Sequence, residues 1–444
     1  MRKSSPALAL AVAVAVAVAV GVAVAVAACA PTPRPETPLP AGPITALRFG
    51  SLVDGSGRVV RNAVVLINAD TIVRVSAGGA IPSNARVIDL HQYTAIPGMI
   101  DVHTHMTYWR DKDKDPLGRA APRSKDSIVM MAAANARATL ETGVTSVRDL
   151  GSTNYTDIAM RDSINKGAMI GPRMFVAGYG LQKATTGRGG QPPTANPATG
   201  RIVDTSNVAA AVKAQVDAGV DWIKMYASTG SFQNVTGRQT FTDREIQIAV
   251  QEAHRWGKPI AIHSYGDTGG RTAMRAGANS VEHPAGLNDA TLAEWAKTNV
   301  YYVPTIDHNR FYAENARLLN YTPEQIAGLD SFIALNLETT RRAVKAGVKI
   351  AMGSDAVYWM FGENTHELKW LVMAGLTPAQ ALATATTNAA DLLHMPTKLG
   401  KIAPGYFADI VAVDGDPLAD IDVVISRVKW VMKGGAVVVD KRRP

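Results

Sequence analysis

Residues 97–105 read Pro-Gly-Met-Ile-Asp-Val-His-Thr-His, an apolar run that ends in two histidines. Side chains two positions apart in a β-strand point to the same side, so His103 and His105 would face one direction. Two imidazole nitrogens placed in this way can bind one metal ion. A histidine pair on an exposed strand often has no role, but a pair that closes a buried strand favours a metal site.

Seven further short apolar runs follow this one, separated by helical stretches. The alternation predicts an α/β fold with parallel strands. Eight such units over residues 95–398 fit a (β/α)8 TIM barrel, whose active sites lie at the carboxyl ends of the strands. Several helices end in an Ala-Gly pair, a typical C-cap signal, at 218–219, 276–277 and 346–347. The expected strands are 95–105, 144–149, 174–177, 222–226, 259–263, 280–283, 301–305 and 349–355.

Both flanks of the expected barrel are rich in β-structure. Short β-branched runs separated by Gly, Asn and Asp turns occupy residues 44–94, and the same texture returns at 399–444. We therefore expect one small β-sandwich built from both ends of the chain.

The first residues are typical of an export signal. Arg2 and Lys3 precede a charge-free run of mostly Ala and Val, and residues 1–28 form the expected signal. Val-Ala-Ala-Cys at 26–29 resembles a lipobox, which favours lipid attachment at Cys29 and a periplasmic or outer-membrane-anchored lipoprotein. A plain secretory signal or an uncleaved membrane anchor are the alternatives. The Pro-rich segment 29–43 would then be an extended tether.

Composition excludes several classes of partner and site. The 444 residues are 47% hydrophobic, enough for a large core, and the net charge of +8 comes from scattered basic residues. No nucleic-acid partner is expected, and the lipid anchor would be the only membrane contact. The single cysteine excludes an internal disulfide and a thiolate zinc site.

Three more strand ends carry candidate metal ligands. His263 and His283 close the fifth and sixth expected strands, and Asp355 closes the eighth. One such histidine is more often a core residue, but two on neighbouring strands, facing a histidine pair, favour ligands. Asp355 can serve both as a ligand and as a proton acceptor from water.

Lys224 on the fourth expected strand is the least ordinary residue of this group. An ammonium beside metal cations would be repelled, so Lys224 must be neutral or modified. Reaction of its amine with CO2 would give an anionic carbamate that can bind metal. The alternative is a buried lysine paired with a carboxylate.

With these residues the chain resembles the amidohydrolase superfamily, in its two-metal, lysine-carbamate branch. The resemblance spans about 47–434 and also includes Glu282-His283, Gly353-Ser354-Asp355 and the closing stretch 400–411. It implies two divalent metal ions, with zinc expected. The first would be bound by His103, His105 and Asp355, the second by His263 and His283, and carbamylated Lys224 and a hydroxide would bridge them.

The stretches 223–228, 263–266 and 303–305 look like the imidazolonepropionase-related group of prolidases. That group includes Xaa-Pro dipeptidases, carboxypeptidases and ochratoxin A amidohydrolases. The resemblance implies hydrolysis of the amide bond of dipeptides or N-acyl amino acids with a free carboxylate, ochratoxin A included, in a homo-oligomer. True imidazolonepropionase is a poorer match, because it uses one metal and lacks the strand-four lysine.

The resemblance also suggests catalytic and substrate-binding residues. Asp355 would move the proton, and Tyr265 would donate to the developing oxyanion, unless it only packs the strand end. Arg188 in the loop after the third strand could bind a carboxylate or be a solvated loop residue. Tyr226 and His308 are further candidates for contact with substrate.

Two other functions remain open at this point. The same metals could open a lactone or a cyclic amide, or the chain could be a non-catalytic binding lipoprotein. Six intact ligand positions favour an enzyme over the binding protein.

Overall fold

The computed structural model describes residues 39–40, 42–119, 123–186, 190–228 and 238–442. The expected signal at 1–28, Cys29, most of the tether and Arg188 lie outside these residues. Within the described ranges, no helix combines the length and the apolar character needed to cross a membrane.

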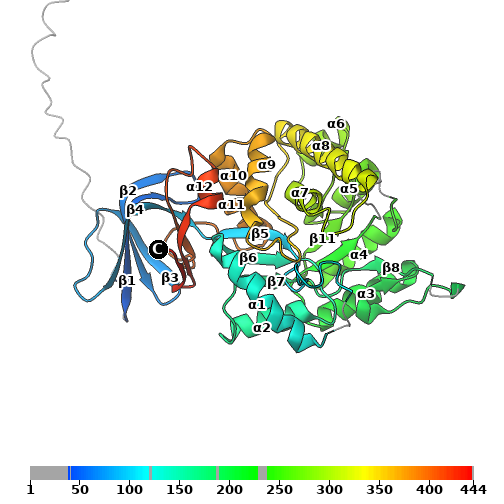
Figure 1. Cartoon of the computed structure of the whole chain (residues 1–444), viewed down its shortest axis with the longest axis horizontal. Helices are drawn as coiled ribbons and strands as arrows, with labels where there is room; N and C mark the ends of the chain where they lie inside the picture. Colours follow the sequence, from blue (N-terminus) through cyan, green and yellow to red (C-terminus); the bar gives the residue numbers. More distant parts are fainter. Residues whose placement is uncertain (1–38, 41, 120–122, 187–189, 229–237, 443–444) are drawn as a thin grey trace, which may run out of the picture. The chain divides into compact units, whose positions relative to one another are not determined.

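Both ends of the chain contribute strands to one seven-stranded sheet, in the order β16-β15-β14-β4-β1-β2-β3. Strand β4 joins the two contributions, since it pairs in parallel with β1 and antiparallel with β14. The blue and red strands therefore lie together in Figure 1. The strands are β1 (Ile44–Val53), β2 (Val59–Asn68), β3 (Thr71–Ala77), β4 (Arg86–Pro97), β14 (Ile410–Val413), β15 (Val428–Lys433) and β16 (Ala436–Asp440).

Among the described residues, the strands expected in the β-sandwich form one continuous hydrogen-bonded sheet. Because β4 pairs along both of its edges, the N-terminal and C-terminal strands join edge to edge in one continuous sheet. Edge strand β3 also approaches the segment before β14, through a bridge between Thr71 and Phe407. Phe49 and Trp430 are fully buried in the core of this sheet.

The middle of the chain has parallel strands followed by helices, which confirms the expected α/β class. One sheet has the order β5-β6-β7 and the other β10-β11-β12-β13. A two-stranded parallel pair, β8 with β9, lies in the loop after β7. The bounds are β5 (Met99–Thr104), β6 (Val144–Asp149), β7 (Arg173–Val176), β8 (Gln182–Lys183), β9 (Arg201–Ile202), β10 (Ile223–Tyr226), β11 (Ile260–His263), β12 (Ser280–Glu282) and β13 (Tyr301–Val303).

Two of the expected strands differ from the prediction. The first begins at Met99, because residues 95–97 belong to β4 and pair with β14 in the other sheet. The eighth, 349–355, forms no regular ladder. Its backbone instead bridges the outer strands of the two parallel sheets: Tyr302 N donates to Lys349 O at 2.9 Å, and Val102 N donates to Met352 O at 3.0 Å.

Helices follow the parallel strands and surround them (Figure 1). Their inward apolar side chains, such as Leu140 of α1 and Ile246 of α4, share one core with strand residues such as Val147 and Ile262. The helices are α1 (Lys125–Glu141), α2 (Thr156–Asn165), α3 (Thr205–Asp217), α4 (Asp243–Arg255), α5 (Gly266–Arg275), α6 (Asp289–Trp295), α7 (Ile306–Glu314), α8 (Pro323–Ala346), α9 (Glu367–Met373), α10 (Pro378–Thr384), α11 (Thr387–Leu392) and α12 (Asp422–Ser426), with 3-10 turns η2 (Pro197–Thr199) and η3 (Asn364–His366).

The predicted helix ends are confirmed. Helix α8 ends at Ala346, and the next residue, Gly347, has φ +80°. An L side chain rarely adopts this left-handed conformation, so glycine is the residue suited to end the helix and turn the chain towards 349–355.

Candidate metal centre

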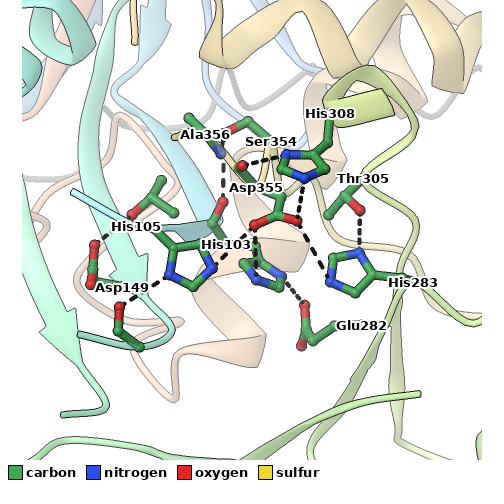
Figure 2. A network of polar contacts seen from close by, with 12 residues as sticks. His103, His105, Asp149, Glu282, His283, Thr305, His308, Ser354, Asp355 and Ala356 are labelled. Atoms are coloured by element: carbon green, nitrogen blue, oxygen red, sulfur yellow. Dashed lines mark hydrogen bonds and ion pairs between the residues drawn. The ribbon is translucent and has the colours of Figure 1, made fainter. Parts of the chain in front are cut away.

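His103 and His105 lie at the carboxyl end of β5 and face the same acid. Nε2 of His103 is 3.4 Å, and Nε2 of His105 is 3.2 Å, from Oδ1 of Asp355. Figure 2 shows both rings turned towards this carboxylate. One potential ligand atom from each of the three residues lies within 4.8 Å of the others, and all three residues are buried. The predicted two-residue spacing therefore brings a buried His-His-Asp group together.

Asp355 is held in place by its backbone as well as by its side chain. Its φ is +53°, uncommon for a residue other than glycine, and its N–H donates to His103 O at 2.7 Å. His308 Nδ1 donates to the Asp355 carbonyl at 2.8 Å, and His308 Nε2 lies 3.5 Å from Oδ2. Burial opposes ionisation, but the pKa of Asp355 still falls well below its usual range because His308 and His103 favour the carboxylate.

His283 and His263 complete the histidine group. Nδ1 of His283 bonds to the Thr305 hydroxyl, which leaves Nε2 3.7 Å from Asp355 Oδ2. The His283 ring centroid lies 4.9 Å from those of His103 and His263. Burial lowers the pKa of His283 well below its usual value and that of His263 to about 3. Both rings are therefore neutral, the form that binds metal.

Lys224 is buried beside this group, and its Nζ has no hydrogen-bond partner among the residues that the structure describes. It is 1% exposed, and its Nζ lacks a hydrogen bond, so no carboxylate pairs with it within the described part of the chain. Nζ lies 5.1 Å from the centre of the Tyr226 ring, and burial lowers the pKa of Lys224 to about 8. A lysine in this state is partly neutral at ordinary pH, as carbamate formation requires.

The donor set fits divalent cations. His103 Nε2 is a second buried atom without a hydrogen bond, and buried polar atoms are rarely left unpaired. It lies next to neutral imidazoles and an ionised carboxylate, which are standard ligands for zinc and similar ions. The unpaired atoms of His103 and Lys224 thus lie where metal would supply the missing partner.

Two charged residues that were not predicted as site residues orient the candidate ligand His103. Glu282 Oε2 accepts from His103 Nδ1 at 2.8 Å, and Glu282 Oε1 accepts from Arg148 Nη2 at 2.9 Å. Both Glu282 and Arg148 are fully buried. Such carboxylate–imidazole contacts fix the ring and its tautomer. The available signal was a charge inside an apolar strand, at Arg148 in β6 and Glu282 in β12.

Asp101 has a similar role through Ser354, the residue before Asp355. Its carboxylate accepts from Ser354 Oγ at 2.5 Å, Ser354 N at 2.9 Å and Asn364 Nδ2 at 2.9 Å. The loop that carries Asp355 is thereby tied to β5, the strand that carries His103.

The expected substrate residues surround the centre at different positions. The Tyr265 ring lies 4.6 Å from that of His263 and 5.3 Å from that of Phe332, and burial raises its pKa. The Tyr226 ring lies 5.7 Å from that of His263. His308, expected to contact substrate, lies against Asp355.

Tyr108, whose ring stacks on His105 at 4.6 Å, lines two cavities. One, of about 580 Å³, has Tyr226 and Arg201 among its walls, and the other, of about 360 Å³, has Trp109 and Tyr358. Both volumes suit small molecules.

A second group of possible ligands, Asp307, Glu363 and His366, lies outside this centre. Arg310 forms ion pairs with both Asp307 and Glu363. An arginine already balances these acids, so the group is better described as an ion-pair network than as a metal site.

Comparison with known proteins agrees with this geometry. The sequence pattern of the amidohydrolase family matches residues 94–438. The chain belongs to the amidohydrolase family. Amidohydrolases of this kind are enzymes, and the chain is accordingly a hydrolase of carbon–nitrogen bonds.

Within its family, this amidohydrolase is similar to an ochratoxinase and to prolidases. It is 29% identical to the ochratoxinase of Aspergillus niger over 421 residues, 88% of this chain and 86% of the relative. A crystal structure of a Xaa-Pro dipeptidase with methionine bound in the active site has a TM-score of 0.80 and 30% identity, covering 89% of this chain and 99% of that one. A prolidase complexed with N-methylphosphonate-L-proline has a TM-score of 0.80 and 27% identity, covering 89% and 100%.

Proposed function

We propose that this amidohydrolase cleaves the amide bond of dipeptides or N-acyl amino acids that carry a free carboxylate. The buried group of His103, His105 and Asp355, with the unpaired Lys224 beside it, is the observation that carries the proposal. Relatives named ochratoxinase, Xaa-Pro dipeptidase and prolidase support this substrate class, and ochratoxin A is one candidate within it.

His103, His105 and Asp355 would hold one divalent ion, with zinc expected, and His263 and His283 a second. Lys224 would contact both as a carbamate, formed when its neutral Nζ attacks the carbon of CO2 and one proton is released. When bound, such ions lower the pKa of water and polarise the carbonyl under attack. Held by the two cations, the carbamate would also have the partners that the buried Nζ lacks among the described residues.

Two side chains around the centre have different roles in the reaction, proton transfer and hydrogen-bond donation. An Asp355 oxygen accepts the proton of the attacking water and passes it to the leaving nitrogen, while His308 and the backbone hold the carboxylate in place. Tyr265 keeps its phenolic proton at neutral pH because burial raises its pKa, so it can donate a hydrogen bond to the oxyanion.

The proposal extends to the surroundings of the site. The parallel strands β5–β7 and β10–β13, with 349–356, would form the closed eight-stranded barrel of a catalytic domain at 95–398. The chain would be exported, with lipid attached at Cys29, and would assemble as a homo-oligomer. Labelling cells with a radioactive fatty acid would test the anchor, since Cys29→Ala should remove the label.

A substrate panel with metal analysis tests the main proposal. Full-length protein purified with zinc should hold about two metal ions per chain and release free amino acid from dipeptides and N-acyl amino acids. Asp355→Asn should lose turnover on the same panel. Turnover of lactones or cyclic amides alone would favour ring opening, and fewer than about one ion per chain would contradict the metal centre.

A further inference from the structure

We propose that Arg201 binds the substrate carboxylate in the cavity beside Tyr226. The proposal rests on the amide hydrolysis proposed above and specifies how its substrate is placed. It concerns the larger cavity next to the metal centre, of about 580 Å³, which is called the Arg201 cavity below.

The Arg201 cavity adjoins the candidate metal ligands through two of its wall residues. The carbonyl of Gly151 accepts from His105 Nδ1 at 3.1 Å. The ring of Tyr226 lies near both His263 and Lys224, at 5.7 Å from the former ring and 5.1 Å from the Lys224 Nζ. A molecule in this cavity would therefore lie next to the metal centre.

Two glycines allow Tyr226 to form the wall between cavity and metal centre. A Cβ added at Gly180 would lie 2.3 Å from Cε2 of Tyr226, and one at Gly151 would lie 2.8 Å from its hydroxyl oxygen. Both approaches are closer than a real Cβ permits. Larger residues would push the Tyr226 ring out of its place, so the small residues here are part of the cavity's shape.

Arg201 is the one charged residue among the cavity walls that the structure describes. The other polar walls include Ser152, Gln182 and Asn196, which are uncharged. Within the described ranges, no carboxylate pairs with the Arg201 guanidinium. A guanidinium offers a fork of donors that matches a carboxylate and can bind it with two parallel hydrogen bonds.

The smaller cavity, which Tyr108 also lines, differs from the Arg201 cavity in its charges. Its walls hold two arginines, Arg110 and Arg123, and two acids, Asp111 and Asp115, so its charges balance. The Arg110 guanidinium already lies 3.8 Å from the centre of the Tyr358 ring. A carboxylate would gain less here than in the Arg201 cavity.

The two cavities together give the substrate a direction. Tyr108 borders both and stacks on His105, so both cavities would be within reach of a substrate whose amide bond lies at the metal centre. The carboxylate half would occupy the Arg201 cavity. The aromatic and apolar walls of the other, among them Trp109, Met131 and Ile128, would receive the acyl half.

Equilibrium binding tests this placement without turnover. Full-length zinc-loaded protein is titrated calorimetrically with L-methionine and with L-methioninamide, which lacks the carboxylate. Arg201→Gln should weaken methionine binding about ten- to hundredfold, the effect of one lost charged hydrogen-bond pair, and leave methioninamide binding unchanged. Arg86→Gln is the matched control, because Arg86 is also an exposed strand residue but lies in β4 of the other sheet.

The outcomes separate this proposal from the proposed function. Equal methionine affinities for wild type and Arg201→Gln, or no methionine binding by wild type, would overturn the Arg201 site. If Arg201→Gln does not fold, Arg201→Lys replaces it. Lysine cannot form the two parallel hydrogen bonds, so the affinity for methionine should still fall relative to that for methioninamide. An unchanged affinity ratio would overturn the site. Absence of hydrolysis of N-acyl-methionine by wild type would instead contradict the proposed function, while Arg201-dependent binding would leave the carboxylate site standing.

Discussion

Glu282 Oε2 accepts a hydrogen bond from Nδ1 of His103 at 2.8 Å, and this contact determines which nitrogen of the ring faces the metal centre. Since Nδ1 carries the proton, Nε2 has its lone pair free on the side of Asp355. The two residues come from β12 and β5, 179 positions apart.

Glu282→Gln tests this orienting role. The amide retains the shape but brings an NH2 group towards either His103 or Arg148, so the tautomer is no longer enforced. Metal affinity should fall about tenfold or more, measured by competition with a chromogenic chelator. Glu294→Gln, an exposed change at an ion pair with Arg275, is the control. Equal affinities in the two variants would contradict the orienting role.

Lys224→Met tests the carbamate. A thioether fills the buried space but cannot react with CO2, so metal content should fall from about two ions per chain to one or fewer. Wild type grown with ¹³C-bicarbonate should show a carbamate carbon in its NMR spectrum that the variant lacks. Lys433→Met is a matched control, because burial also lowers the pKa of Lys433 to about 8, yet it lies beside Arg173 and Asp409. A carbamate signal that persists in Lys224→Met would refute the assignment.

Tyr265→Phe separates catalysis from packing. The ring contact with Phe332 survives, and only the hydroxyl is lost. If Tyr265 donates to the oxyanion, kcat should fall about 10²- to 10³-fold, with KM and metal content nearly unchanged. A variant with wild-type kcat and a lower melting temperature would show that the residue only packs the strand end.

Lys433 gives a pH prediction for stability. Its folded-state pKa is about 8 against an ordinary value of 10.5, first because of burial and then because of Arg173. Between these two pH values the unfolded chain binds more protons than the folded one, so this residue makes the free energy of unfolding rise with pH and contributes its full penalty below about pH 8. Urea titrations at pH 7 to 10.5 should show this rise in wild type and a smaller one in Lys433→Met. Parallel curves would contradict it.

Much of the centre follows from local pattern. The two-residue spacing of His103 and His105 makes both side chains point to the same side of the strand. Because they lie at the end of an apolar strand, both are buried. His263, His283 and Lys224 likewise lie at the ends of apolar strands, and the structure brings all of them together. Each of these positions could be predicted from a single strand, because side chains alternate between the two faces of a strand.

Contacts between distant segments could not be predicted from the pattern of a single strand. The contact of His308 with Asp355 was not predicted, because it depends on how the start of α7 packs on the loop at 355. Glu282 was noted only as part of the family resemblance and Arg148 was not singled out, because their contacts with each other and with His103 join different strands.

The sequence by itself therefore determined the α/β class, the family resemblance and the group of metal-ligand candidates, because strand periodicity and residue chemistry are local properties. The tertiary structure alone decided that β4 joins both chain ends in one sheet, that 349–356 bridges two parallel sheets, and that Arg201 stands in a cavity beside Tyr226. Those features depend on which surfaces pack together across hundreds of residues. The free energy of that packing comes from the whole core, so no single stretch of sequence determines it.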